Sequence, residues 1–346
     1  MELEKFIAAG EPIAYKDAKS RVALAIEVQN KLTELGLLDP SITGSESNPF
    51  GPEAAHSDPP DKNTLFALDH FGQITHIPLG GAFTVELAER LLQSNRDNFL
   101  PLVLDEFASD SAETILAKRI LRYLQGKGYW IARSPEMLNI VYIEGADADG
   151  RKNKDEDNQF NDRRILIRVG SGGIPEIVHN VSATTEPSIE FAQTDTAKGR
   201  KGAARIAFGQ YKAWKMGFHQ QRTHGLNHPA LTQSGLLRIH RDLNADGSRS
   251  GDKVYIGTGF GVNQHSTRQS ETRFSRVSSF SARRGRVSSW SEGCLVGQVW
   301  EEHGEFLRML QKDIRYVQNK DYIFMSAVLN GDDFSDTMMG TRGVPA

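Results

Sequence analysis

Hydrophobic residues in the first third of the chain recur at three- and four-residue steps, which is the period of an amphipathic helix. In residues 16–36 this pattern ends at Gly36, a residue type that commonly terminates helices. Similar patterns predict further helices over residues 65–71, 84–92 and 111–124. Residues 39–61 between them are rich in Pro, Gly, Ser and Asn, which predicts a loop.

The pattern changes after about residue 137. Short β-branched runs bounded by turn-forming residues predict strands at 139–143, 164–169, 176–181, 236–240, 254–258 and 322–329. A return of helical spacing predicts one helix over 299–310. The predicted fold class is therefore α+β, with an α-helical domain in residues 1–130, a mainly β domain in residues 131–333 and a flexible tail in residues 334–346.

Composition narrows the possible classes of protein. The chain has 346 residues, of which 41 are basic and 44 acidic, and this near balance argues against a surface built throughout for nucleic acid. No run of about 18 apolar residues occurs, so we expect no membrane span. The acidic start at Glu2 and Glu4 lacks the features of a secretory signal, so we expect synthesis as a soluble cytoplasmic protein.

The chain contains a single cysteine, Cys294, which excludes an internal disulfide and a thiolate zinc cluster. One interpretation is a small buried hydrophobic residue. The other is a nucleophile, because Gly293 before it lets the backbone approach a ligand closely and a Ser-x-Gly-Cys turn can direct N–H groups at an oxyanion. A nucleophilic thiol also needs a base, and His265, 29 residues upstream in a Gly-rich segment, is the candidate.

The motifs Gly-x-Asn-x-His-Ser and Ser-x-Gly-Cys-Leu-Val resemble the active-site region of L,D-transpeptidase catalytic domains. Those enzymes use a Cys–His pair on a β-sandwich to cut and re-form peptide bonds in peptidoglycan stems, and they require no cofactor. The resemblance implies that Cys294 is the nucleophile and His265 the base, that the backbone of Ser266 orients the imidazole, and that the Gly293 and Cys294 amides form an oxyanion hole. It also implies substrate-binding roles for Trp290, Ser291, Glu292, Asn263 and Thr185.

A second resemblance concerns the N-terminal part. Residues 28–38, 50–52 and 63–71 are similar to the small three-helix peptidoglycan-binding domains that often accompany wall enzymes. Together the two resemblances imply that the partner is peptidoglycan and that the site of action is the cell wall or the periplasm.

Two departures from the family bear on activity. Glu292 occupies a position where most members have histidine, and its charge would tend to raise the pKa of the thiol. The interval between His265 and Cys294 is also unusually long. It is rich in serine and arginine, which fits either a basic flap over the site or a solvated loop: Arg268, Arg273, Arg276, Arg283, Arg284 and Arg286.

The segment that starts at Asp242 fits the opening of a calcium loop, with oxygen ligands at alternating positions and Gly247 at the sharp turn. Candidate ligands for a structural ion are Asp242, Asn244, Asp246 and Asp252. Position twelve is a lysine rather than glutamate, and both neighbours are predicted strands, so a polar hairpin explains the same residues. A zinc site at His219, His224 and His228 is disfavoured by their irregular spacing.

Two functions remain open at this point. The first is a cysteine enzyme that processes peptidoglycan stem peptides by acyl transfer or hydrolysis through a Cys294 thioester, as a phage endolysin or an injected wall-degrading effector would. The alternative is a non-catalytic wall-binding or structural protein of a phage or contractile particle. The sequence does not specify the bond, the acceptor, the delivery route or the oligomeric state.

Overall fold

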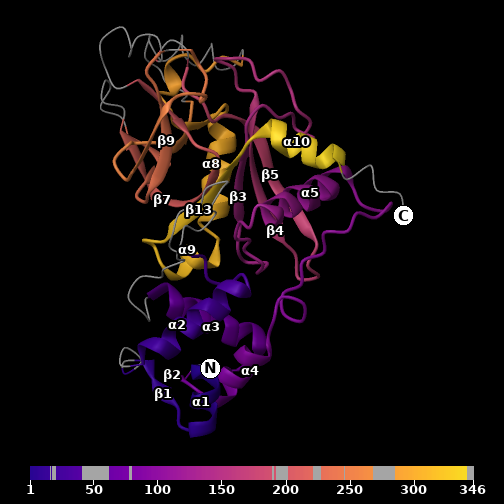
Figure 1. Ribbon diagram of the computed structural model, residues 1–346, viewed down its shortest axis with the longest axis vertical. Helices are drawn as coiled ribbons and strands as arrows, with labels where there is room; N and C mark the ends of the chain where they lie inside the picture. The colour runs from indigo at the N-terminus through magenta and orange to yellow at the C-terminus, as the bar shows by residue number, and fades with distance from the viewer. Residues whose placement is uncertain are drawn as a thin grey trace.

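The computed structural model describes residues 1–15, 17, 21–40, 62–77, 80–188, 191, 202–220, 227–244, 246–267 and 285–340. A helical N-terminal region is followed by a region that combines a large mixed sheet with further helices, which confirms the α+β class (Figure 1). Among the described residues, no helix combines the length and the apolar character needed to cross a membrane.

The N-terminal region is a group of helices around its own apolar core. It contains α1 (Glu2–Ala9), α2 (Val22–Glu34), α3 (Lys62–Thr75) and α4 (Val85–Gln93), with the two-stranded ribbon β1 (Ile13–Ala14) and β2 (Ala82–Phe83). Thr84 caps α4 by accepting the N–H of Leu87. Fully buried side chains from three of the helices meet in the core: Leu32, Phe71 and Leu87.

Helix α5 (Ala112–Gly126) belongs to a different core. It lies within residues 1–130, the range predicted for the helical domain, yet its apolar face packs on strands of the second region. Ile120 and Leu121 are fully buried there with Val141 and Ile165. The apolar stripe of α5 therefore covers one face of the sheet.

Eight strands of the second region close into a barrel with the order β11-β12-β5-β4-β3-β13-β7-β8. It closes because β11 pairs with β12 on one side and with β8 on the other. The family resemblance implied a sandwich, so the closure is a difference from that expectation. The strands are β3 (Asn139–Ile143), β4 (Asp162–Val169), β5 (Pro175–Thr184), β7 (Gly209–Gln220), β8 (Asn227–Gln233), β11 (Gln264–Ser266), β12 (Leu295–Gly297) and β13 (Ile323–Leu329).

A three-stranded antiparallel sheet stands beside the barrel, in the order β10-β9-β6. It consists of β6 (Ala203–Ile206), β9 (Leu237–Asp242) and β10 (Lys253–Gly257). Ile206 and Ile239 are fully buried against the barrel core. A short 3-10 helix, η2 (Ser288–Trp290), precedes the cysteine.

Three helices complete the C-terminal part: α8 (Trp300–Leu310), α9 (Ile314–Gln318) and α10 (Gly331–Gly340). The last of these differs from the predicted flexible tail. Asn330 accepts the N–H groups of Asp332 and Asp333 at the start of α10, and Phe334 is fully buried with its ring 5.5 Å from that of Tyr123. Capping and burial therefore order residues 331–340, and α10 lies beside α5 (Figure 1).

The two regions pack on each other around Asp39. Its carboxylate binds the ammonium of Lys212 at 2.7 Å and accepts the hydroxyl of Tyr322 at 2.8 Å. Asn319, directly after α9, donates to Asn63 in α3, and Figure 1 shows α9 between the helical region and the strands. A buried charged contact of this kind fixes one orientation of the two regions.

Candidate active site

Parallel pairing of β11 with β12 brings the two sequence motifs together. Gln264 pairs with Leu295 and His265 with Val296. Gln264 faces the barrel core, where it bonds to Tyr142 and Ser326. Because side chains alternate along a strand, His265 and Val296 face the other way, and Cys294 lies on that same face.

The sulfur of Cys294 contacts the backbone that leads into β11. It accepts the N–H of Asn263 and donates to the carbonyl of Gly261, each at 3.4 Å. Gly293 makes this approach possible, because its φ of 122° is unusual for residues with a side chain and a Cβ there would lie 2.2 Å from the carbonyl oxygen of Ala204. The predicted need for glycine before the cysteine thus has a steric cause.

The environment of Cys294 favours the neutral thiol. Burial raises its pKa to about 11, and the negative charge of Glu292 raises it as well, while the N–H of Asn263 has the opposite effect. Glu292 itself is exposed. The effect of Glu292 on the pKa of the thiol is therefore the one expected from its negative charge.

His265 is buried, with 1% of its surface exposed. Its Nδ1 lies 3.0 Å from the carbonyl oxygen of Ser266. A carbonyl only accepts, so Nδ1 carries the proton and Nε2 carries the lone pair. Nε2 has no hydrogen-bond partner among the described residues. The ring is therefore held in one tautomer, with its accepting atom Nε2 buried and unpartnered among the described residues.

Two further histidines surround this ring. His219 stacks on His265 with centroids 4.3 Å apart and an interplanar angle of 5°, and His228 approaches edge-on at 5.3 Å. Burial, together with these two histidines, lowers the pKa of His265 well below its ordinary value. At neutral pH the pair is thus a neutral imidazole and a neutral thiol.

The loop before the cysteine is held by Ser291. Its hydroxyl donates to the carbonyl of Cys294 at 2.9 Å and accepts the N–H of Gly293 at 3.1 Å. The N–H of Ser188 donates to its carbonyl. The Gly293 amide, predicted to line an oxyanion hole, is thus engaged by Ser291, and Trp290, predicted to bind substrate, is buried.

The remaining predicted substrate-binding residues occupy different positions. Asn263 lies at the sulfur, with its side-chain Oδ1 accepting the N–H of Gln233 and its Nδ2 next to Nδ1 of His219. Thr185 is fully buried, and its N–H and hydroxyl both bind Asp162. Of these two residues, Asn263 is the one that contacts the sulfur.

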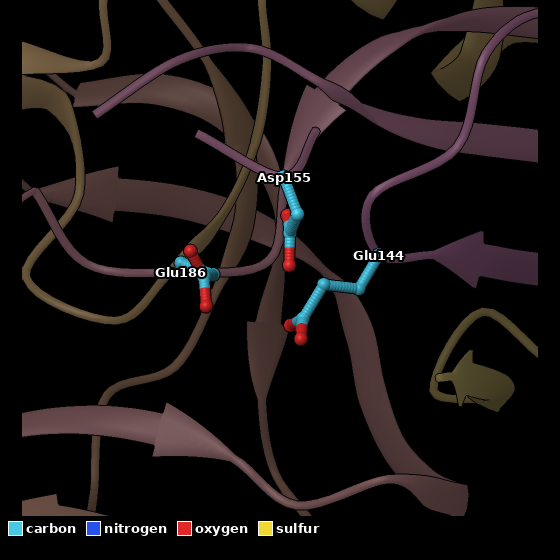
Figure 2. A group of neighbouring side chains, drawn as sticks. All are labelled: Glu144, Asp155 and Glu186. Atoms are coloured by element: carbon cyan, nitrogen blue, oxygen red, sulfur yellow. The ribbon is translucent and has the colours of Figure 1, made fainter. Parts of the chain in front are cut away.

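The hydroxyl of Thr185 hydrogen-bonds to two members of a cluster of buried carboxyl groups, Glu144 and Asp162. One oxygen each of Glu144, Asp155 and Glu186 lies within 4.8 Å of the others, and Figure 2 shows the three side chains converging from separate loop segments. Asp162 adjoins them and accepts the N–H of Gly145 at 2.8 Å. Oxygens at this spacing are compatible with a metal ion.

Two guanidinium groups already balance part of this charge. Arg249 donates to both oxygens of Glu144, at 2.6 and 2.5 Å, and Arg205 donates to Glu186 at 2.5 Å. Burial, and then the charge of Glu144, raises the pKa of Asp155 to about 6 and raises the pKa values of Asp162 and Glu186 further. The cluster is therefore stabilised by arginine and by retained protons.

A pocket of about 460 Å³ opens beside the cluster and is lined by Asp155, Phe160 and Asp162, among others. Cys294 is not among its described lining residues. Phe160 lines the pocket and also packs in the apolar cluster that Cys294 contacts. The pocket and the candidate nucleophile are distinct features.

The predicted calcium-loop residues lie where β9 and β10 form a hairpin, in agreement with the predicted neighbouring strands. Arg286 is exposed, whereas the other arginines of the interval, Arg268 to Arg284, lie outside the described residues, as does His224. The structure therefore bears on neither interpretation of that interval.

Sequence reasoning missed the histidine pair and the carboxyl cluster. His219 and His228 are register partners in the β7–β8 hairpin, a pairing that alternation of polar and apolar residues there could have suggested. The acidic residues are spread from 144 to 186 and follow no motif. The turns that bring them together depend on the closed sheet.

The sequence matches no protein-family model and no curated protein. Among solved structures, it is similar to a fused Zn-dependent amidase/peptidase/peptidoglycan-binding domain-containing protein from Clostridium acetobutylicum. The two chains are 10% identical, with 92% of this chain and 99% of that chain covered and a TM-score of 0.28. A likeness at that score does not establish a shared fold.

Proposed function

We propose that this chain is a cysteine-dependent enzyme that processes peptidoglycan stem peptides through a thioester on Cys294. The observation that carries the proposal is the parallel register of β11 and β12, which sets the strand that contains His265 beside the strand that directly follows Cys294. The motif resemblance to L,D-transpeptidases supplies the substrate class. The helical N-terminal region, with its resemblance to peptidoglycan-binding domains, supports the same substrate.

The chemistry follows from a neutral thiol and a neutral imidazole. As the sulfur attacks the carbonyl carbon of a stem peptide bond, Nε2 of His265 accepts the thiol proton. The proton then passes to the leaving amine as the C–N bond breaks, and a thioester remains on Cys294. An incoming amine gives a new cross-link, and water gives a shortened stem.

One rearrangement precedes this step. The thiol bonds to the carbonyl of Gly261 in the structure, so its side chain must rotate before the proton can move to His265. We expect bound substrate to displace that contact, because catalytic hydrogen bonds often form only in the substrate complex.

The test is mass spectrometry of muropeptides incubated with the protein and with Cys294→Ala. New cross-links or exchange of a terminal residue, lost in the variant, would identify a transpeptidase. Shortened stems or lost cross-links, again only with the thiol present, would identify a peptidase. Binding of both proteins to purified sacculi, measured in parallel, separates recognition from chemistry.

A second candidate is a non-catalytic wall-binding or structural protein. The engaged amide of Gly293 and the raised pKa of Cys294 favour it, since neither suits a nucleophile awaiting substrate. Identical muropeptide profiles from the protein and Cys294→Ala, with sacculus binding retained by both, would support this candidate and contradict the enzyme.

A further inference from the structure

We propose that the hairpin loop from Asp242 to Asp252 binds one calcium ion. The spacing places oxygen-bearing side chains at positions one, three and five, which are Asp242, Asn244 and Asp246, and glycine at position six, Gly247. Gly247 has a φ of 72°, the conformation required at the sharp turn of such a loop.

The strand register brings two carboxylates face to face at the mouth of this loop. Lys253 pairs with Arg241 in the antiparallel β9–β10 ladder. Continued by one residue, the register sets Asp252 opposite Asp242. Asp252 directly precedes β10 and Asp242 ends β9, so the two acidic side chains lie at the same end of the ladder, where a bound cation would reduce their mutual repulsion.

The carboxylate of Asp242 is oriented into the loop. Its residue is fully buried, and Oδ2 accepts the N–H of Gly247 at 3.2 Å. Its Oδ1 is buried and has no hydrogen-bond partner among the described residues, and the same holds for Oδ2 of Asp252. Burying an acceptor without a partner is costly, whereas a bound cation would satisfy both oxygens.

The basic residues of the loop are directed elsewhere. Arg249 binds Glu144 in the carboxyl cluster, and Lys253, which stands where glutamate would complete an EF-hand, lies over the ring of Tyr255 at 5.2 Å. The loop therefore has three carboxylates of its own and no lysine or arginine of its own bound to them among the described residues.

Ligand type and flexibility point to calcium rather than magnesium. The available donors are oxygens, namely three carboxylates, the amide oxygen of Asn244 and the backbone carbonyl of Ser248 at position seven. Calcium accepts six to eight oxygens in irregular geometry, whereas magnesium needs a near-ideal octahedron. Asn244 donates to Asp246 at 2.7 Å, so binding would exchange that hydrogen bond for two ligands.

The test is calorimetric titration of the chelator-treated full chain with CaCl₂ and with MgCl₂, together with thermal unfolding. We expect one calcium per chain, much weaker magnesium binding, and a rise in Tm of about 5 °C or more at a hundredfold excess over Kd. Asp242→Asn keeps the shape of the residue and should weaken calcium binding at least about 10-fold. Asp246→Asn, at an exposed position, gives the same test if the first variant folds poorly.

Two controls locate the ion. Asp97→Asn, at an exposed residue of another loop, should leave calcium binding unchanged. Asp155→Asn tests the carboxyl cluster of Figure 2 and should also leave it unchanged. The proposal is overturned if calcium gives neither heat nor a Tm shift, if both loop variants bind normally, or if binding is lost only with Asp155→Asn. None of these outcomes affects the proposed cysteine chemistry.

Discussion

Cys294 should react slowly with thiol reagents at neutral pH, because its surroundings raise its pKa. Its pKa is about 11, whereas an unperturbed thiol has a pKa of about 8.5. At pH 7.5 the thiolate fraction is then about 3 × 10⁻⁴ instead of about 0.1, a difference of roughly 300-fold. A more basic thiolate attacks faster, with a Brønsted coefficient of about 0.4–0.5, which recovers about 10- to 18-fold. The net rate should be about 20- to 30-fold below that of the unfolded chain.

The assay is the reaction with 4,4′-dithiodipyridine from pH 6 to pH 10, native and in urea. All of the signal comes from Cys294, because the chain has no other cysteine. The native rate should rise tenfold per pH unit throughout this range. Glu292→Gln removes a charge that raises the pKa and should increase the rate, whereas Glu305→Gln, on the exposed face of α8, should not.

A plateau below pH 8 that disappears in His265→Ala would refute this reasoning. Such a profile would mean that the resting pair is a thiolate and an imidazolium. The lowered pKa of His265 excludes that form at neutral pH, so the inferred proton positions would then be wrong. A native rate equal to the unfolded rate would equally contradict the raised pKa of the thiol.

Three further predictions concern stability. Burial raises the pKa values of Asp162 and Glu186 to about 8 and about 9. Their contribution to the free energy of unfolding is therefore fully present below the unfolded pKa near 4 and is lost as pH rises through the folded values. Tm should fall between pH 6 and pH 9, and Glu186→Gln should make Tm depend less on pH. Gly293→Ala places a Cβ 2.2 Å from a backbone oxygen and should lower the free energy of unfolding in urea by at least about 1–3 kcal/mol. If burial orders α10, Phe334→Ala should lower the free energy of unfolding by about 3–5 kcal/mol, whereas Thr337→Ala, at an exposed position, should change it by less than about 0.5 kcal/mol. Equal effects of the two variants would contradict burial as the cause.

The elements with strong local patterns could be predicted from the sequence. The strand over 139–143 and the helix over 299–310 match β3 and α8 closely, because each carries one regular period and a clear end. Strands β11 and β12 have three residues each and no pattern of their own. They form because neighbouring strands supply hydrogen-bond partners, and sequence periodicity cannot show this.

The candidate site divides in the same way. A glycine at 293 could be predicted from the turn directly before the cysteine, whereas the clash with Ala204 that requires it could not, because Ala204 is distant in the chain. The surroundings of His265 could not, since His219 and His228 lie on the β7–β8 hairpin, which meets β11 only when the barrel closes. Helix α10 was missed because its order depends on Phe334, a fully buried aromatic side chain in a largely polar, Gly-containing segment.

The position of the cysteine loop depends on contacts outside it. The N–H of Ser188 binds the carbonyl of Ser291, and the N–H of Ala204 binds the carbonyl of Glu292. Ser188 lies two residues after Glu186, and Ala204 directly precedes Arg205. The contact between the side chains of Arg205 and Glu186 therefore joins the two segments that hold the loop. Because this contact is buried, removing either partner would leave the other polar group without its hydrogen-bond partner next to these segments. The carboxyl cluster thus supports the geometry at Cys294 without contacting the sulfur.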